Sequence, residues 1–214
     1  MQQRSWGCQD ETVRFVWRIV HGVTPPPDPH RRNEQSRQAI VQAAVELCGE
    51  VGFDKTTVEA IAARAGVGKQ TIYRWWPSKA AVLLEFMKDL RSSRADFPDT
   101  GDLRTDLRTQ NAALVNLFGS RGGVVWRGLI AAAQSDPVAA AGVREVIDEA
   151  VADCSARLAK AVNAGQLRAD VDLELVVELV YGPLYHAYLL RPDRIAGWRP
   201  EEALDALFSG LQPR

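Results

Sequence analysis

Three consecutive side chains, Lys69, Gln70 and Thr71, carry groups that can distinguish base pairs in DNA. Lysine donates hydrogen bonds to guanine, glutamine pairs bidentately with adenine, and the threonine methyl group contacts the methyl group of thymine. All three residues stand at the start of a short helix that we predict over residues 68–75. The N-terminal end of a recognition helix is the part that meets base edges in the major groove. We therefore predict that these three side chains contact bases.

Two further side chains suit phosphate oxygens better than bases. Tyr73 lies in the same predicted helix, and Lys79 stands at the start of the next one. Hydroxyl and ammonium groups commonly donate to the DNA backbone, and such contacts fix the register of a protein on the duplex without reading its sequence. We predict backbone contacts for both residues.

The spacing of apolar residues predicts the helices that position these side chains. Steps of three and four residues predict a first helix over 35–51. Thr56 and Glu59 have the spacing of a capping box, which predicts the start of a second, short helix. The residues predicted to face inward are Ile40, Ala43, Ala44, Leu47 and Val51 in the first helix, and Val58, Ile61, Ala62 and Ala65 in the second.

A three-residue turn at 65–67, which contains Gly66, leads from the second helix into the helix at 68–75. Pro77 ends that helix, and Ser78 is placed to cap a fourth helix over 79–94. Two short helices joined by such a turn and backed by a longer helix have the layout of a helix-turn-helix motif.

This region resembles the DNA-binding domain of TetR-family transcriptional regulators over about residues 37–86. The similarity lies in the runs TTVEAIA, at 56–62, and AGVGKQTIYRWWPSK, at 65–79. The resemblance implies a homodimeric repressor with an N-terminal three-helix DNA-binding domain and a helical ligand-binding domain behind it. Carried over by position, it adds Thr57 and Trp75 to the backbone-contact candidates.

Two positions depart from the family pattern. Gly68 stands where serine or threonine is common, which removes one possible hydroxyl contact. Trp75 stands where histidine is frequent, so its indole N–H would have to donate any hydrogen bond to a phosphate. The run from Gly66 to Thr71 also suggests a phosphate-binding loop, but Ala63 and Gln70 occupy positions where that motif needs glycine and serine or threonine.

The rest of the chain predicts only helices, so we expect an all-α fold of about nine helices. The helix-turn-helix DNA-binding domain is expected over 34–80, and a C-terminal helical domain for effector binding and dimerisation over 81–214. Residues 1–33 contain a run of prolines and are expected to form a disordered or weakly structured extension. The further helices are predicted over 103–118, 124–134, 137–163, 172–190 and 200–211.

The predicted helix over 172–190 is apolar almost all round, as in a helix that is buried on more than one side. It can lie wholly in the core, or it can face the core on one side and a second subunit on the other. We expect the second arrangement, in which the helices near 172–190 and 200–211 form a four-helix homodimer interface. The last helix contributes an apolar stripe of Leu204, Leu207, Phe208 and Leu211.

A small-molecule effector needs an apolar pocket with few polar anchors. For each candidate residue, ordinary core packing is the alternative, and the residues do not identify the ligand. His186 is expected to be either a core histidine or a ligand contact. The candidates for lining the pocket are Phe118, Trp126, Leu129, Ile130, Tyr181 and Tyr185.

The net charge of the whole chain, −1, taken alone argues against a nucleic-acid partner. The net charge of the whole chain combines two segments with different charge. Residues 34–94 carry nine Lys and Arg against seven Asp and Glu, whereas residues 95–214 carry twelve against seventeen. The DNA-reading part is therefore mildly basic, and the rest is acidic.

The three cysteines and three histidines are scattered, which predicts neither a metal site nor a closed set of disulfides. We find no catalytic constellation, no secretion signal and no apolar stretch long enough to cross a bilayer. We therefore expect a cytoplasmic protein without a cofactor, a membrane partner or enzymatic activity.

Together these patterns predict a transcriptional repressor that a small-molecule effector releases from a near-palindromic operator in double-stranded DNA. A transcriptional activator or a ligand-insensitive regulator would show the same residues. A small-molecule carrier or enzyme with an incidental helix-turn-helix is the alternative from a different class.

Overall fold

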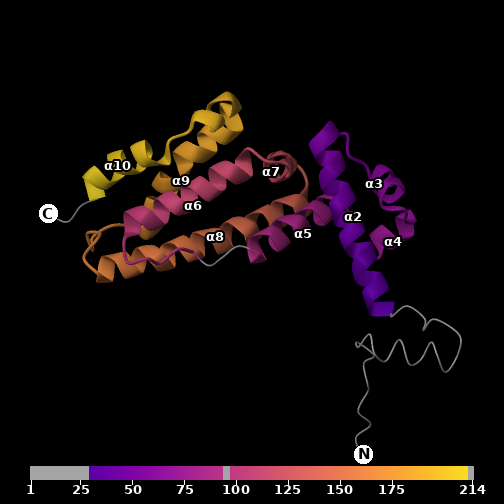
Figure 1. The fold of residues 1–214 in the computed structure, drawn as a ribbon, viewed down its shortest axis with the longest axis horizontal. Helices are drawn as coiled ribbons and strands as arrows, with labels where there is room; N and C mark the ends of the chain where they lie inside the picture. Colours follow the sequence, from indigo (N-terminus) through magenta and orange to yellow (C-terminus); the bar gives the residue numbers. More distant parts are fainter. Residues whose placement is uncertain (1–28, 94–96, 212–214) are drawn as a thin grey trace, which may run out of the picture. The chain divides into compact units, whose positions relative to one another are not determined.

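The computed structural model describes residues 29–93 and 97–211, and every regular element in this part of the chain is a helix (Figure 1). The prediction of an all-α fold is confirmed, and each of the nine predicted helices corresponds to one α-helix. A short 3-10 helix, η1, is additional. The elements are α2 (Pro29–Val51), α3 (Val58–Ala65), α4 (Lys69–Tyr73), α5 (Lys79–Ser92), α6 (Leu103–Phe118), α7 (Arg121–Ala132), α8 (Pro137–Asn163), α9 (Leu173–Leu190), η1 (Pro192–Gly197) and α10 (Pro200–Leu211).

The predicted N-terminal extension is partly wrong. Helix α2 begins at Pro29, whereas the periodicity predicted a start near residue 35. Proline is tolerated in the first turn of a helix because its missing N–H would have no intrahelical partner there. The rest of the predicted extension, residues 1–28, lies outside the described residues.

Helix α7 also begins earlier than predicted. The sequence predicted that Gly122 and Gly123 interrupt the chain before a helix at 124, but both glycines lie inside α7. The reason is a cap that the pattern did not reveal. The Oγ of Ser120 accepts a hydrogen bond from the backbone N–H of Gly122 at 3.1 Å, which compensates for the low helix propensity of glycine at this end.

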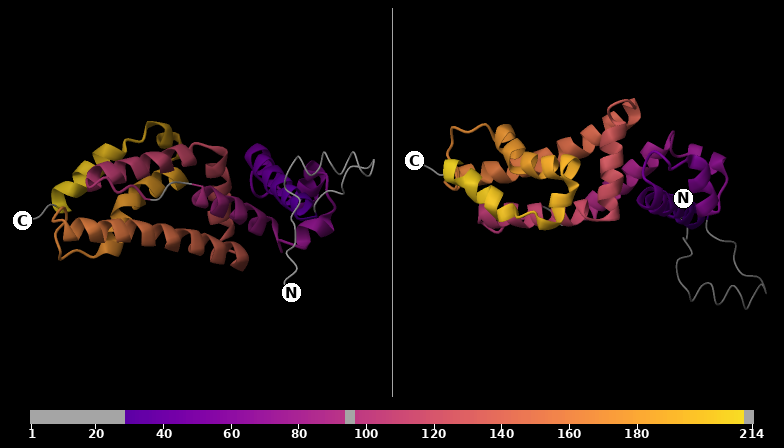
Figure 2. Two further views of the ribbon diagram at one scale, coloured as in Figure 1. Left: turned by 60° about the horizontal axis from the view of Figure 1, so that its bottom comes forward. Right: turned by 90° about the horizontal axis from the view of Figure 1, so that it is seen from above.

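The chain divides into two compact units, residues 1–38 and 39–214. In the first unit the described residues form the start of α2, where Arg37 pairs with Glu34 on the helix surface at 3.0 Å. In the second unit, α5 packs along α8 and against α7, while α10 packs against α6 and α9 (Figure 2).

Two clusters of buried apolar side chains form the core of residues 39–214. The first joins the helix-turn-helix to α5, α7 and the end of α9, and the second lies among α6, α8, α9 and α10. Most of the predicted inward-facing residues are buried, but Val51 is 45% exposed because it ends α2. Ala65 is only partly buried. The residues whose predicted burial is confirmed are Ile40, Ala43, Ala44, Leu47, Val58, Ile61 and Ala62.

A buried ion pair joins α6 to α8 beside the second cluster. The carboxylate of Asp106 is fully buried, and it lies 2.7 Å from Nε and 2.6 Å from Nη2 of Arg157. The N–H and the hydroxyl of Thr100 donate to the other carboxylate oxygen at 3.0 and 2.7 Å. Burial alone would raise the pKa of Asp106, but the bonds from Thr100 and the Arg157 guanidinium outweigh it and hold the pKa below its ordinary value.

Replacement of Asp106 by alanine should lower the free energy of unfolding by about 3–5 kcal/mol, because the buried Arg157 guanidinium would lose its buried partner and keep only the longer contact with the half-exposed Asp99 at 3.4 Å. Since the pKa of Asp106 is depressed in the folded state, this contribution is present above the ordinary value of 3.8. It is lost as the pH falls through the folded-state pKa. Denaturant titrations of the wild type and Asp106→Ala at neutral pH and near pH 3 measure both effects.

The matched control is Asp170→Ala, which removes an exposed carboxylate that pairs with Arg168 at 2.7 Å. It should change stability little, because exposed ion pairs are screened by water. Equal effects of the two substitutions at neutral pH would contradict a special role for the buried pair.

Candidate functional site

The cap of α3 differs from the predicted one. Thr57 rather than Thr56 is the N-cap residue, and its Oγ1 accepts a hydrogen bond from the N–H of Ala60 at 3.1 Å. The Thr56 side chain is buried, and its hydroxyl donates to the carbonyl oxygen of Gly52 at 2.8 Å. The sequence could not distinguish two adjacent threonines, because the choice depends on the extended backbone at Thr57 and on the loop before it.

Gly66 makes the turn between α3 and α4. Its φ of +67° lies in the left-handed region, where glycine carries no steric penalty. The N–H of Val67 donates to the carbonyl of Ala62 at 3.0 Å, which completes a common glycine-based helix end. Helix α4 then ends at Tyr73 rather than at Trp75, and the fully buried side chain of Ile72 holds it against the core.

The predicted base-contact residues lie together at the start of α4. Lys69 and Gln70 are exposed, and Thr71 is half-buried. The Lys69 ammonium lies 3.1 Å from a carboxylate oxygen of Glu59 on α3, in an ion pair that is open to solvent. A hydrogen bond from the backbone of Glu59 itself and the one from Lys69 lower the pKa of the Glu59 carboxyl group.

The predicted backbone-contact residues fall into two groups. Thr57 and Tyr73 are exposed, and the Thr57 hydroxyl still has its own proton to donate while its oxygen caps α3. Trp75 is half-buried, and its ring lies edge-on to that of Trp76 with 5.3 Å between centroids. The indole N–H of Trp76 donates to Glu85 on α5, so this pair fastens the end of α4 to α5.

Lys79 is engaged within the protein. Its Nζ donates to the carbonyl oxygens of Phe53 at 2.7 Å, Asp54 at 3.1 Å and Thr56 at 2.8 Å. These carbonyls belong to the loop between α2 and α3, so Lys79 connects that loop to the start of α5. The backbone contact proposed for Lys79 from its position competes with these three bonds.

Three of the predicted effector contacts meet in one aromatic cluster. Phe118 lies edge-on to Tyr185 with 5.2 Å between ring centroids, and the indole N–H of Trp126 donates to the Tyr185 hydroxyl at 3.2 Å. Leu129 is buried and Ile130 half-buried in the same core. Burial raises the pKa of Tyr185, which keeps its hydroxyl protonated.

Sequence reasoning missed Tyr188 as a member of this cluster. Its ring stacks on Phe118 with 3.8 Å between centroids, and its hydroxyl donates to the carbonyl of Gly123. The guanidinium of Arg127 lies 4.7 Å from the centre of the same ring. The spacing of three residues between Tyr185 and Tyr188 on one helix was the available signal, because residues at that spacing share a face.

Tyr181 does not join the other predicted effector contacts. It packs in the second apolar cluster, where its hydroxyl is hydrogen-bonded to Cys154. Burial raises the pKa of the Cys154 thiol to about 11, so this cysteine stays protonated and unreactive at neutral pH.

The outer face of α9 is apolar and exposed in a single chain. Leu175, Leu179 and Leu190 are 51%, 46% and 69% exposed. His186 is exposed on the same helix, so the expectation of a core histidine is wrong, while a ligand contact stays a prediction. Pro183 lies inside the helix and is exposed as well.

The stripe predicted on the last helix points elsewhere. Leu204 and Phe208 of α10 are each 4% exposed and pack in the second cluster of their own chain, and Leu207 is half-buried there. The side chain of Leu211 lies outside the described part. The periodicity marked the buried face of α10 correctly but could not tell which surface covers it.

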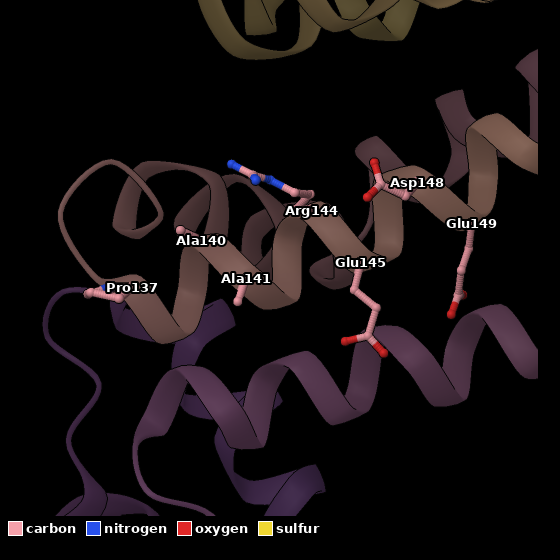
Figure 3. A pocket seen from close by; sticks show the side chains of 7 residues that line it. All are labelled: Pro137, Ala140, Ala141, Arg144, Glu145, Asp148 and Glu149. Carbon is pink, nitrogen blue, oxygen red and sulfur yellow. The ribbon is translucent and has the colours of Figure 1, made fainter.

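A hollow of about 600 Å³ lies on the surface of α8, away from the predicted effector contacts (Figure 3). Glu145 and Glu149 point toward α5, where they pair with Lys88 and Arg91, while Arg144 points away. The hollow is open to solvent, four of its seven lining residues are charged, and none of the predicted effector contacts lines it. Its lining residues are Pro137, Ala140, Ala141, Arg144, Glu145, Asp148 and Glu149.

Within residues 29–93 and 97–211, no group of three or more His, Cys, Asp or Glu side chains is arranged to hold a metal ion. No helix there combines the length and the hydropathy that a membrane span requires.

Both parts of the chain match known protein families. Residues 40–86 match the family of bacterial regulatory proteins called the tetR family, and residues 97–207 match the tetracyclin repressor-like C-terminal domain. A curated relative is the uncharacterised HTH-type transcriptional regulator YdeS of Bacillus subtilis. It is 35% identical over 85% of this chain and 92% of its own length.

Solved structures show the same fold. The crystal structure of the TetR family transcription regulator SCO0332 is 34% identical and covers 84% of this chain and 100% of its own, with a TM-score of 0.65. The flavonoid-responsive regulator FrrA is 25% identical and covers 85% and 99% of the two chains, with a TM-score of 0.59.

The exposed ion pair between Lys69 and Glu59 generates a prediction about binding to duplex DNA. Glu59→Gln removes a negative charge near the phosphates and releases the Lys69 ammonium. We expect affinity for duplex DNA to rise about three- to tenfold at low salt, with the difference shrinking as salt increases. Fluorescence anisotropy with a labelled duplex at several salt concentrations measures this effect.

The matched control is Glu202→Gln, which removes an exposed carboxylate from α10. It should leave duplex binding unchanged. Weaker binding by Glu59→Gln would show that Glu59 supports the interface rather than restraining Lys69.

Proposed function

This chain belongs to the TetR family of helix-turn-helix transcriptional regulators, and we propose that it is a repressor that a small-molecule effector releases from its operator. The observation that carries this proposal is the exposed start of α4, where Lys69, Gln70 and Thr71 lie together on a helix held by Ile72. The similarity of residues 97–207 to a repressor C-terminal domain supports the repressor role.

In the proposed complex the start of α4 enters the major groove. Gln70 pairs with adenine, Lys69 with guanine after leaving Glu59, and the Thr71 methyl group contacts thymine. Thr57 and Tyr73 donate to phosphates on either side, and such contacts set the register. In a symmetric dimer the two copies of α4 reach successive major grooves, so the operator is near-palindromic.

The partner that we propose for the outer face of α9 is a second copy of this chain. Leu175 and Leu179 are large apolar side chains that a soluble monomer would leave in water. Regulators of this family act as dimers, and a twofold axis lets one apolar face cover its own copy. The exposed side of α10 supplies the polar edge of this interface, since Leu204 and Phe208 are occupied within their own chain.

The proposed effector site is the aromatic cluster of α6, α7 and α9. Phe118, Trp126 and Tyr185 offer ring faces and one hydroxyl group, which suits a largely apolar ligand with an aromatic part. The name of the flavonoid-responsive relative agrees with such chemistry. The effector shifts the equilibrium away from the DNA-binding conformation. The size of this shift is limited by the difference between its affinities for the two conformations.

Selection of duplexes from a random-sequence pool tests the proposed function. The wild type should enrich a near-palindromic sequence, and its affinity should fall steeply as salt rises. Gln70→Ala and Thr71→Ala should change the preferred base at one position of each half-site. For Gln70→Ala the loss of discrimination should be about 1–3 kcal/mol.

The control is Gln42→Ala, which removes an exposed glutamine from α2 and should leave the preferred sequence unchanged. If the wild type enriches no sequence and binds DNA without salt dependence, the proposed function is wrong. If Gln70→Ala and Thr71→Ala select the wild-type sequence, Gln70 and Thr71 are not the base contacts, and the assignment of the protein as a DNA-binding regulator is unaffected.

The proposed dimer face makes a second prediction. Leu179→Glu should raise the dimer dissociation constant about 100-fold or more, because each interface loses two buried leucines and gains two charges. Sedimentation velocity at several concentrations measures the change. Ile147→Glu on α8, which replaces a side chain that is 38% exposed, is the control and should leave the dimer intact. A wild-type monomer at high concentration would refute the interface.

A further inference from the structure

The helix-turn-helix segment has two ends, and one side chain joins them. The chain enters α3 from the loop at 52–56 and leaves the turn after α4 at Ser78, which caps α5. Lys79 follows directly, and its Nζ donates to three carbonyl oxygens of that loop at 2.7–3.1 Å. An ammonium group has three N–H donors, so the loop occupies all of them.

The loop that receives Lys79 is itself held in shape. The buried Thr56 hydroxyl donates to the carbonyl of Gly52 at 2.8 Å, and the N–H of Thr56 donates to the carbonyl of Phe53 at 3.2 Å. The Lys79 ammonium also lies 4.5 Å from the centre of the Phe53 ring, where a cation is attracted to the aromatic face. Lys79 therefore binds a preformed cage of carbonyls with an aromatic wall.

The same phenylalanine contacts the effector domain. A Cβ atom on Gly128 of α7 would lie 2.4 Å from the Cβ of Phe53, so the absence of a side chain at Gly128 lets the loop approach α7. Near the start of α7, the Arg121 side chain lies against Gly49 of α2. Helix α7 also carries Trp126, so the helix that touches the loop is the one that lines the aromatic cluster.

We propose that Lys79 is a positioning residue for DNA recognition rather than a phosphate contact. It acts by closing the helix-turn-helix segment onto the loop at 52–56, and that loop is fixed to α7 through Phe53 and Gly128. The proposal rests on the proposed function, because it concerns how the recognition helix is oriented. It departs from the role that the position of Lys79 in the sequence suggested.

The two roles predict different salt dependence. A phosphate contact contributes equally on every duplex, and its loss lowers the slope of log K against log salt by about 0.9. A positioning residue releases no counterions of its own, so its loss leaves that slope unchanged. It lowers affinity for the selected sequence, where the orientation of α4 is important, much more than for a scrambled sequence.

The test compares the full-length wild type with Lys79→Met on two duplexes, one selected by the wild type and one scrambled. For Lys79→Met we expect about tenfold or greater loss of affinity on the selected duplex, unchanged affinity on the scrambled duplex and a wild-type salt slope on both. Lys55→Met is the matched control, since it removes an exposed lysine from the same loop. It should keep the preference for the selected duplex.

A second variant examines the contact with α7. Gly128→Ala should displace Phe53 and lower affinity for the selected duplex, although Gly128 lies outside the DNA-reading helices. Gly119→Ala is its control, because a Cβ there would meet its nearest neighbour, the carbonyl oxygen of Val115, at an ordinary 3.5 Å. If Lys79→Met does not fold, Gly128→Ala and Gly119→Ala still test the proposal.

Several results would overturn the proposal. A salt slope reduced by about 0.9 on both duplexes, with equal loss of affinity, would make Lys79 a phosphate contact. Wild-type binding by Gly128→Ala would remove α7 from the arrangement. If the wild type selects no duplex, the proposed function fails, but hydrogen exchange still tests whether Lys79 holds the loop at 52–56. Lys79→Met should then speed exchange of the amides at 52–61, whereas Lys55→Met should not, and equal exchange in both would refute it.

Discussion

A helix of five residues has to present the groups that we propose to read DNA, and no helix of that length is stable in water by itself. Helix α4 exists because Ile72 is fully buried beneath it and because Gly66 turns the chain back onto α3. Further contacts around α4 help to hold it in place. The cap at Thr57 starts α3, the Trp76 indole fastens the far end of α4 to α5, and Lys79 closes the base of the segment.

Helix α5 connects the helix-turn-helix to α7 and α8. Its apolar side packs in the first cluster, and its polar side carries a row of exposed ion pairs to α8: Lys88 with Glu145, and Arg91 with Glu149 and Asp153. Each exposed pair contributes little, so apolar packing determines where α5 lies against α8. The aromatic cluster belongs to the same core as the helix-turn-helix, so a ligand that separates its rings disturbs packing that continues beneath α4.

Periodicity predicted the helices well because burial of one face imposes steps of three and four residues, and Ile61 and Leu47 lie where that rule placed them. It failed where a local hydrogen bond determines the helix start, as at Thr56 and Thr57, and where Ser120 caps a helix with two glycines in its first turn. The pattern also could not say what covers an apolar face. Phe208 looked like an interface residue and packs within its own chain, whereas Leu179 is exposed.

The candidate site divides in the same way. Local order along the chain placed Lys69, Gln70 and Thr71 together, because three consecutive residues at a helix start cannot be separated by the fold. The effector candidates depended on contacts between distant helices, so Tyr188 was missed and Tyr181 lies in the other cluster. The carbonyl groups that bind Lys79 belong to residues 23 to 26 positions earlier in the chain, and no spacing pattern in the sequence predicts these contacts.

Both ends of the helix-turn-helix meet at the Lys79 ammonium group. This arrangement affects which substitutions the segment can accept. The loop before α3 and the residue after α4 lie next to each other. Residues between them can therefore be substituted without changing the path of the chain before or after the segment, provided that Lys79 and its carbonyl partners remain. Residues at the outward positions of α4 can then change without altering the contacts that Lys79 makes with the loop at 52–56. The way the segment is attached to the protein is therefore independent of the side chains that it presents outward.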